Sequence, residues 1–194
     1  MNVAVLFARA DSIYKTLPNC DVWDKVRDAR RWAGGSPVVA HPPCRAWGAL
    51  AHMAKPRKDE KSLAFFSVSQ VQKFGGVLEH PLASKLWAVA KLPAVGRRDR
   101  HGGITIIVDQ FWFGHVAHKW TRLYICGADG DMPPMPIRFG AAPKTITGIK
   151  GQPGHRCTDA EREHTPPDFA LWLVELAKRC KGGSSAVKPR RHGD

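Results

Sequence analysis

The feature that most constrains the fold is a recurrent alternation of short apolar runs with segments of helical spacing. The runs are Asn2–Phe7, Pro37–Ala40, Val77–Leu78, Ile104–Val108 and Arg122–Cys126. Several of them are apolar throughout, which is typical of strands that are buried on both faces. Strands that alternate with helices predict an α/β, Rossmann-like domain with a mostly parallel sheet and helices on both faces.

Four segments have the apolar spacing of helices. They are Asp21–Trp32, Asp59–Phe74, Leu82–Ala90 and the residues after Thr165-Pro166-Pro167-Asp168. Gly-Gly pairs follow the first two segments and predict where those helices end. In the last one, Thr165 is expected to be the N-cap, with a proline at the first helical position. Residues 132–153 are rich in proline and glycine, which predicts an irregular surface segment.

The length of 194 residues suits one domain with its own core. We expect a single α/β catalytic-type domain over residues 1–180. Residues 181–194 begin with glycine and serine and continue with basic residues, which predicts a disordered basic tail. The sequence leaves the oligomeric state open.

The charge balance is strongly basic. The chain has 30 Lys and Arg against 17 Asp and Glu, a net charge of +13. This excess predicts a polyanionic partner, most simply nucleic acid and DNA first; the alternative is that the charge only promotes solubility. The five cysteines lack paired spacing, and no apolar stretch reaches the roughly 18 residues of a membrane span. We therefore expect reduced thiols, no membrane partner and a cytoplasmic location, in a bacterium or a virus-infected cell.

Cys44 is the strongest candidate for a catalytic residue. It ends the segment His41-Pro42-Pro43-Cys44, directly after a predicted strand, and ligands bind at that edge of open α/β sheets. The two prolines stiffen the loop, and Arg45 and His41 are expected to favour the reactive thiolate. The alternative is a structural role, because most free cysteines pack as small apolar residues.

Glu79 follows the predicted strand Val77–Leu78. Partial burial there is expected to raise the pKa of the carboxyl group and to suit it to donating a proton. The alternative is a carboxylate that caps the next helix.

Residues 110–122 combine cations with aromatic side chains, a mixture that can contact phosphate and stack on a base. The competing interpretation is that Phe111, Phe113 and Trp120 pack in the core. His155, Cys157 and His164 lack the paired spacing of a zinc module, so no metal site is predicted.

Three of these segments, in order, resemble the DNA cytosine-5 methyltransferases, whose sheet carries Pro-Pro-Cys, then Glu-Asn-Val, then Gln-x-Arg-x-Arg. Pro42-Pro43-Cys44 resembles the first. Gly76-Val77-Leu78-Glu79 resembles the second, although His80 and Pro81 replace the family's Asn and Val. Residues 109–127 resemble the third. The match covers scattered pieces of residues 3–127, so the chain is similar to a reduced, divergent form of these enzymes.

The resemblance implies a role for particular residues. Cys44 would attack C6 of a pyrimidine, Glu79 would act at N3, and Arg122 would support the base or its phosphate. It also implies an S-adenosylmethionine site at Phe7, Ala8, Arg9, Asp11 and Ser12, although Arg9, Ala10 and Asp11 replace the family's glycines. The residues expected to contact the substrate or nucleic acid are His41, Pro43, Arg45, Trp47, His80, Gln110, His115, His118 and Lys119.

Three functions remain open from the sequence. The first is a minimal methyltransferase-like enzyme, of the kind a phage or mobile element encodes, that modifies a pyrimidine in DNA. The second keeps the Cys44 and Glu79 chemistry but uses another donor, or acts on RNA or a free nucleotide. The third is a non-catalytic nucleic-acid-binding protein in which Cys44 is structural. From the length of the chain we expect no separate target-recognition domain of the kind that the resembled enzymes insert after their third motif.

Overall fold

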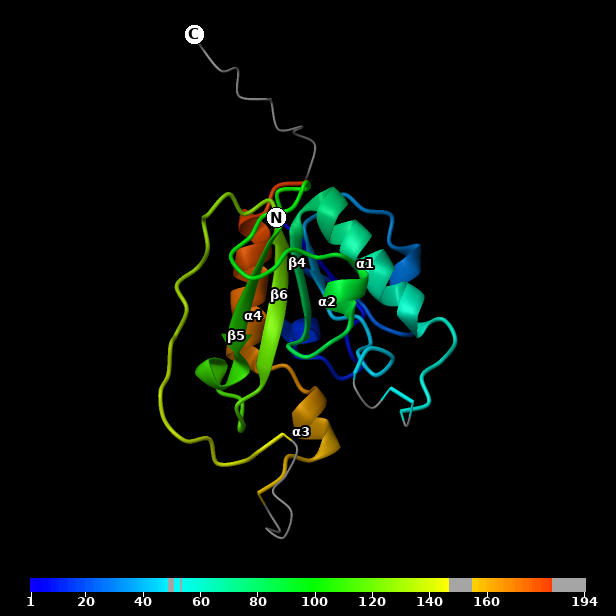
Figure 1. Cartoon of the computed structure of the whole chain (residues 1–194). Helices are drawn as coiled ribbons and strands as arrows, with labels where there is room; N and C mark the ends of the chain where they lie inside the picture. The colour runs from blue at the N-terminus through cyan, green and yellow to red at the C-terminus, as the bar shows by residue number, and fades with distance from the viewer. Residues whose placement is uncertain (49–50, 53, 147–154, 183–194) are drawn as a thin grey trace.

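The computed structural model describes residues 1–48, 51–52, 54–146 and 155–182, and these form a six-stranded sheet (Figure 1). The strand order is β2-β1-β3-β4-β6-β5. The strands are β1 (Val3–Leu6), β2 (Cys20–Trp23), β3 (Val38–Ala40), β4 (Gly76–Pro81), β5 (Ile104–Asp109) and β6 (Trp120–Cys126).

The sheet is mixed. Strands β2, β1, β3 and β4 pair in parallel, whereas β6 runs antiparallel between β4 and β5. The α/β class is therefore confirmed, but the expectation of a mostly parallel sheet is corrected at its β5–β6 end. The physical reason is the short connection 110–119, in which Gly114 turns the chain with a φ of 90°. A parallel connection would need a crossover along the whole sheet.

Two of the predicted helices are found close to their expected bounds. Helix α1 (Glu60–Phe74) ends at Gly75, which has a φ of 76°, and α4 (Pro167–Arg179) begins with its proline. The N-cap of α4 is Pro166 rather than Thr165, and α2 (Leu86–Val89) is shorter than predicted. The remaining helical elements are α3 (Asp159–Glu163) and the 3₁₀ turns η1 (Ile13–Thr16), η2 (Ala29–Arg31) and η3 (Gln110–Phe113). Within the described ranges, none of the helices combines the length and apolar character needed to cross a membrane.

The predicted helix over residues 21–32 is wrong. This segment forms β2, a turn and η2 instead. Val22 pairs with Val5 in the sheet, and the Asp24 carboxylate accepts hydrogen bonds from the backbone N–H groups of Val26 and Arg27. Asp28 has a φ of 54°, which a continuing helix does not allow. Local hydrogen bonding by the aspartates thus competes successfully with the helical pattern.

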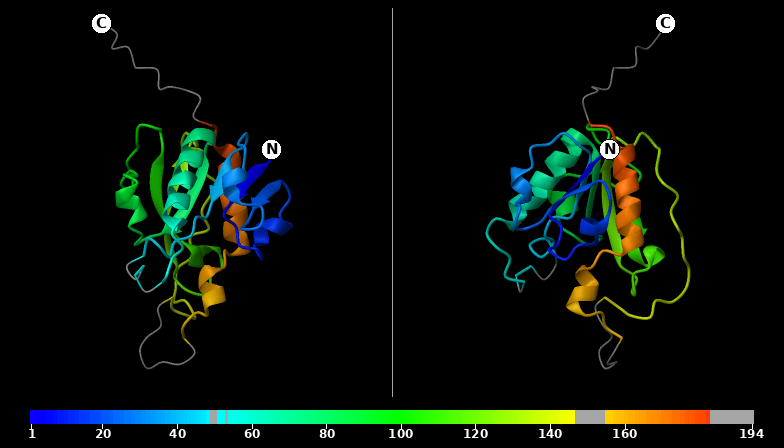
Figure 2. Two further views of the ribbon diagram at one scale, coloured as in Figure 1. Left: turned by 90° about the vertical axis from the view of Figure 1, so that its right-hand side faces the viewer. Right: turned by 180° about the vertical axis from the view of Figure 1, so that it is seen from behind.

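Alternate strand residues divide between two hydrophobic clusters, because successive side chains of a strand point to opposite faces. We call them the α4 cluster and the α1 cluster, after the long helix in each. The α4 cluster contains Val5, Val39, Val77, Leu123 and Leu173. The α1 cluster contains Leu6, Val38, Leu78, Tyr124 and Val68. Figure 2 shows α1 and α4 in two further views, turned by 90° and 180° from that of Figure 1.

The strand directions bring the predicted functional segments to one edge of the sheet. The parallel strands and β5 end at this edge, and β6 begins there. Strands β2 and β3 lie on opposite sides of β1, so the segments after β1 and β3 flank a topological switch point, where open α/β sheets bind ligands. The irregular segment predicted for residues 132–153 contains no helix or strand over 132–146, and its remaining residues lie outside the described ranges. Of the predicted tail, residues 183–194 also lie outside them.

Candidate active site at the carboxyl edge of the sheet

Cys44 lies on the loop after β3, as predicted. The loop is fixed where it leaves the strand, because the backbone N–H of His41 donates to the carbonyl of Leu6 at 3.0 Å. The Cys44 carbonyl then accepts from the backbone N–H of Trp47 at 2.9 Å, which closes a turn around the cysteine. The thiol therefore has a defined position at the edge of the sheet.

The expectation that Arg45 and His41 favour the Cys44 thiolate is not met. Cys44 is exposed, yet the protein atoms crowded around its thiol and the negative charge of Glu79 raise its pKa, and Lys119 opposes this only in part. Arg45 is engaged elsewhere, since its guanidinium holds the carboxylate of Glu60. Cys44 is a thiol at neutral pH in this state.

Glu79 lies inside β4 rather than after the strand. The antiparallel partner β6 extends the ladder as far as the pair Pro81 and Thr121. Glu79 stands opposite Leu123, so its side chain is on the face of the α4 cluster. Its Oε1 accepts from the Thr121 hydroxyl and from Gln110 Nε2 at 3.3 Å, and its Oε2 lies 3.1 Å from His41 Nδ1.

These contacts reverse the predicted shift in the pKa of Glu79. Burial alone raises this pKa, as expected, but hydrogen bonding to His41, the charges of His41 and Lys119, and the Thr121 hydroxyl together lower it to about 2. Donors that stabilise the charged form outweigh desolvation here. Glu79 is a carboxylate at neutral pH and carries no proton to donate.

Tyr14, in η1, is a site residue that the sequence did not indicate. Its hydroxyl lies 2.9 Å from His41 Nε2, and the two ring centroids are 5.4 Å apart. The side chain is buried, and burial together with the charge of Glu79 raises the pKa of the phenol well above its usual value. Its only signal in the sequence is its place in the segment that follows β1.

Lys119 supplies a cation to the same region. Its Nζ donates to the His164 carbonyl at 3.3 Å, which joins the start of β6 to the segment after α3. Burial lowers the pKa of Lys119, while the charges of Glu79 and Cys44 raise it. Lys119 is thus placed to act electrostatically on both candidate catalytic residues.

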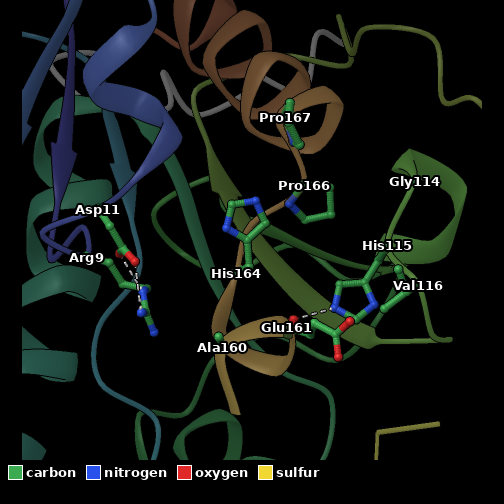
Figure 3. A pocket seen from close by; sticks show the side chains of 10 residues that line it. All are labelled: Arg9, Asp11, Gly114, His115, Val116, Ala160, Glu161, His164, Pro166 and Pro167. Carbon is green, nitrogen blue, oxygen red and sulfur yellow. Dashed lines mark hydrogen bonds and ion pairs between the residues drawn. The ribbon is translucent and has the colours of Figure 1, made fainter. Parts of the chain in front are cut away.

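A cavity of about 320 Å³ opens between the loop after β1, the loop after η3 and the α3–α4 segment (Figure 3). Arg9 and Asp11 lie on one side, His115 and Val116 on the other, and His164 between them. The full lining is Arg9, Asp11, Gly114, His115, Val116, Ala160, Glu161, His164, Pro166 and Pro167. Such a volume is at the lower end of the range for small-molecule sites.

Ion pairs and hydrogen bonds hold this cavity together. Arg9 pairs with Asp11 at 2.9 Å and also with Glu163. His115 Nε2 lies 3.0 Å from the Glu161 carbonyl, and burial lowers the pKa of His115. A neutral His115 therefore donates this hydrogen bond and attaches α3 to the loop after η3.

The predicted cofactor residues separate into two groups. Arg9 and Asp11 line the cavity, whereas Phe7, Ala8 and Ser12 do not. Phe7 has a φ of 63° and packs edge-on against Phe66, with ring centroids 6.1 Å apart. Ala8 is buried in the α4 cluster, and Ser12 precedes η1 as its N-cap.

Arg122 and His80 are not brought to Glu79. They pair with each other across β4 and β6, on the face of the α1 cluster, where both lie near Trp87. His80 is fully buried, and burial lowers its pKa to about 4, so it is neutral. The period of two along a strand puts neighbours of Glu79 and Thr121 on the opposite face.

Trp47, Pro43 and Gln110 offer little free surface. Trp47 is buried and packs on Phe65 with ring centroids 5.5 Å apart, and Pro43 is half-buried. Gln110 is buried, and its amide contacts Glu79. The side chains of these residues pack within the protein and offer little surface for contact with a nucleic-acid strand.

The aromatic segment between β5 and β6 is partly core and partly surface. Phe111 and Phe113 are buried, as the competing interpretation held, but Trp120 is 46% exposed and packs edge-on against Trp112. His118 lies between Asp109 and the Gly140 carbonyl, at 2.6 and 3.1 Å, so it fixes the local backbone. Within this segment Gln110 contacts Glu79 directly, and the charge of Lys119 acts on Glu79 and Cys44.

Comparison with known proteins gives no relative: no family model, curated protein or solved structure matches this chain.

Proposed function

We propose that this protein is a minimal pyrimidine-modifying enzyme of nucleic acid, with the chemistry of the DNA cytosine-5 methyltransferases that its sequence resembles. The observation that carries the proposal is the adjacency of Cys44 and Glu79. Glu79 lies in β4 and Cys44 on the loop after the neighbouring strand β3, both toward the carboxyl edge of the sheet, and the negative charge of Glu79 raises the pKa of the Cys44 thiol. In this proposal the fold is Rossmann-like, with helices on both faces of the sheet.

Cys44 is the nucleophile in this proposal. Its thiolate forms a bond to C6 of the pyrimidine, the C5–C6 double bond opens, and a proton is taken up at N3. C5 then carries the electron pair that attacks an electrophile. Because the pKa of Cys44 is raised, the exposed thiol gives up its proton to solvent water as the substrate binds, and the charge of Lys119 stabilises the resulting thiolate.

Glu79 acts on the opposite side of the ring. As a carboxylate it accepts a hydrogen bond from the exocyclic amino group of cytosine and contacts the N3 proton as it arrives. Thr121 and Gln110 hold Glu79 Oε1, which leaves the carboxylate little freedom to rotate. A fixed carboxylate of this kind orients the base over Cys44.

The cavity in Figure 3 is the proposed donor site. It combines Arg9 and His164 with Asp11 and Glu161, and Val116, Pro166 and Pro167 add an apolar wall. Charges of both signs beside an apolar wall fit an amino-acid zwitterion joined to a nucleoside, as in S-adenosylmethionine. When bound, this donor would supply an electrophilic methyl group.

The proposed substrate is nucleic acid whose target base is unstacked. Exposed Trp120, which follows Lys119 in the sequence, offers a stacking surface, and the chain carries a net charge of +13. A base must leave the duplex before such a site can reach it, so single-stranded DNA is the simplest substrate.

The proposal is tested by the intact mass of the full chain after incubation with oligonucleotides. One set carries 5-fluorocytosine at every cytosine of a random sequence, with S-adenosylmethionine present; its adduct persists because fluorine cannot leave C5 as a proton. A second set carries 2-pyrimidinone, which traps a thiol without any donor. Single-stranded and duplex forms of both are used.

We expect a covalent adduct with both sets, and none with Cys44→Ser. Cys126→Ser is the matched control, because Cys126 is buried in the α1 cluster and should leave the adduct unchanged. No adduct with either base analogue would refute the proposed chemistry and leave a nucleic-acid-binding role.

A second candidate keeps the Cys44 and Glu79 chemistry but uses another donor. The observation that favours it is the loop after β1, where Arg9 is already paired with Asp11 and Glu163 at the cavity. An adduct with 2-pyrimidinone but none with 5-fluorocytosine and S-adenosylmethionine would support this candidate over the first.

A further inference from the structure

Tyr14 and His41 form a continuous row of hydrogen-bonding side chains that ends at the candidate catalytic carboxylate Glu79. Tyr14 comes from η1, His41 from the loop after β3, and Glu79 from β4. The Tyr14 hydroxyl lies 2.9 Å from His41 Nε2, and His41 Nδ1 lies 3.1 Å from Glu79 Oε2. His41 and Glu79 side chains are only 13% and 15% exposed, so water replaces these contacts poorly.

The hydrogen-bond donors and acceptors of these three side chains determine where their protons lie. A carboxylate only accepts, so His41 Nδ1 must carry a proton toward Glu79. With one ring proton, Nε2 accepts from the Tyr14 hydroxyl. With a second ring proton, Nε2 donates to the Tyr14 oxygen instead. Burial and the charge of Glu79 raise the pKa of Tyr14, which therefore keeps its proton and serves either arrangement.

Glu79 alone cannot supply the proton that the proposed reaction needs. Its pKa of about 2 leaves it almost fully ionised at neutral pH. Histidine is the side chain that exchanges a proton in this range, and a partner that fixes its ring controls which nitrogen does so. Other titratable groups also act here: Lys119 on Glu79, Cys20 on Tyr14, and Glu163 on Cys44 and Lys119, while Glu79 acts on Cys44 and His80.

Resting on the proposed function, we propose that His41 and Tyr14 are positioning residues that act through Glu79: the His41 ring holds the proton that Glu79 relays to N3 of the pyrimidine. The transfer is balanced. The Nδ1 proton of the doubly protonated ring moves to Glu79 Oε2, Glu79 delivers a proton to N3 as the Cys44 sulfur bonds to C6, and Glu79 returns to a carboxylate. His41 is left neutral, with its Nε2 proton donated to Tyr14.

The first test needs no substrate and reads the Glu79 carboxyl directly by ¹³C NMR in the full chain. In His41→Gln we expect the pKa of Glu79 to rise from about 2 to above 4.5, because burial then outweighs the remaining donors. Tyr14→Phe removes only the hydroxyl and keeps the ring, so a smaller rise in the same direction is expected, and this variant guards against loss of folding.

The matched control is Tyr124→Phe. Tyr124 is also a buried phenol, but its hydroxyl contacts Asp99 and Gln72 at 2.6 and 3.1 Å, in the α1 cluster. This variant should leave the Glu79 titration unchanged. A Glu79 titration that is the same in His41→Gln as in the wild type would overturn the inference.

The second test is the pH profile of adduct formation with the 2-pyrimidinone oligonucleotide. We expect the rate at neutral pH to fall by about a hundredfold in His41→Gln and by a few-fold in Tyr14→Phe. Alkylation of Cys44 by iodoacetamide should change little, since it needs no proton at N3. If the Glu79 titration shifts but the adduct rate does not change, Tyr14 and His41 have only a structural role and the proposed proton relay is overturned. Absence of any adduct with the wild type would instead refute the proposed function. The Glu79 titration would still test whether His41 and Tyr14 act on Glu79.

Discussion

At the scale of single residues, Glu79 illustrates how a local rule can be reversed by contacts from elsewhere in the chain. The sequence indicates an acid next to an apolar strand, and burial does raise the pKa of such an acid. The pKa of Glu79 is lowered instead, because His41, Lys119 and Thr121 act on the carboxylate from other segments and outweigh burial. Folding therefore holds a charge where the sequence predicted a neutral acid.

This charge makes a pH-dependent contribution to stability. The pKa of Glu79 falls from its ordinary 4.5 to about 2 on folding, so the stabilisation is fully present above pH 4.5 and is lost as pH falls toward 2. We expect the wild type to have a higher free energy of unfolding than Glu79→Gln above pH 4.5. Between pH 4.5 and pH 2 this difference should decrease by on the order of 3 kcal/mol.

Urea unfolding of both proteins at several pH values measures this difference. Asp24, whose pKa is also lowered to about 2, is common to both proteins and cancels. A gap that stays constant between pH 5 and pH 2 would contradict the charged, hydrogen-bonded state of Glu79.

At the scale of elements, the close approach of β3 and β4 explains the Gly75-Gly76 pair. Gly75 ends α1, as the sequence predicts. Gly76 has a φ of 124°, and a Cβ there would lie 2.0 Å from the Val38 carbonyl oxygen. Gly76 therefore permits the close approach of β3, which leads to the Cys44 loop, and β4, which contains Glu79.

We expect Gly76→Ala to destabilise the protein by at least about 3 kcal/mol, because a backbone clash is added to the strain of the positive φ. Gly130→Ala is the matched control: its φ is 89°, but nothing lies within 4 Å of the added Cβ. This variant should lose only about 1 kcal/mol. Chemical denaturation of both variants measures the difference, and equal losses would show that the β3–β4 approach is not tight.

At the scale of the whole molecule, the net charge of +13 follows directly from the residue counts of the sequence. If this charge contacts phosphates, binding must release counterions and weaken as salt is added. We expect the affinity for a single-stranded oligonucleotide to fall at least about tenfold between 50 and 200 mM salt. Fluorescence anisotropy of a labelled strand measures it.

Two variants separate the contributions to this binding. Lys119→Gln removes the cation at the candidate site, whereas Lys188→Gln with Arg190→Gln and Arg191→Gln neutralises the basic tail. A salt slope that is lost only in the tail variant would assign the binding to the tail. An affinity that does not depend on salt would contradict phosphate contact altogether.

The sequence by itself determined the α/β class, helix α1 with its glycine stop, the proline start of α4 and the position of Cys44 after a strand, because these follow from local spacing and turn chemistry. The tertiary structure decided what depends on contacts between distant segments. It inserted β6 antiparallel between β4 and β5, placed Arg122 on the other face from Glu79, and brought Tyr14 to His41. It also decided the charge of Glu79, since a pKa depends on the groups that surround a side chain in space and not on its neighbours in the chain.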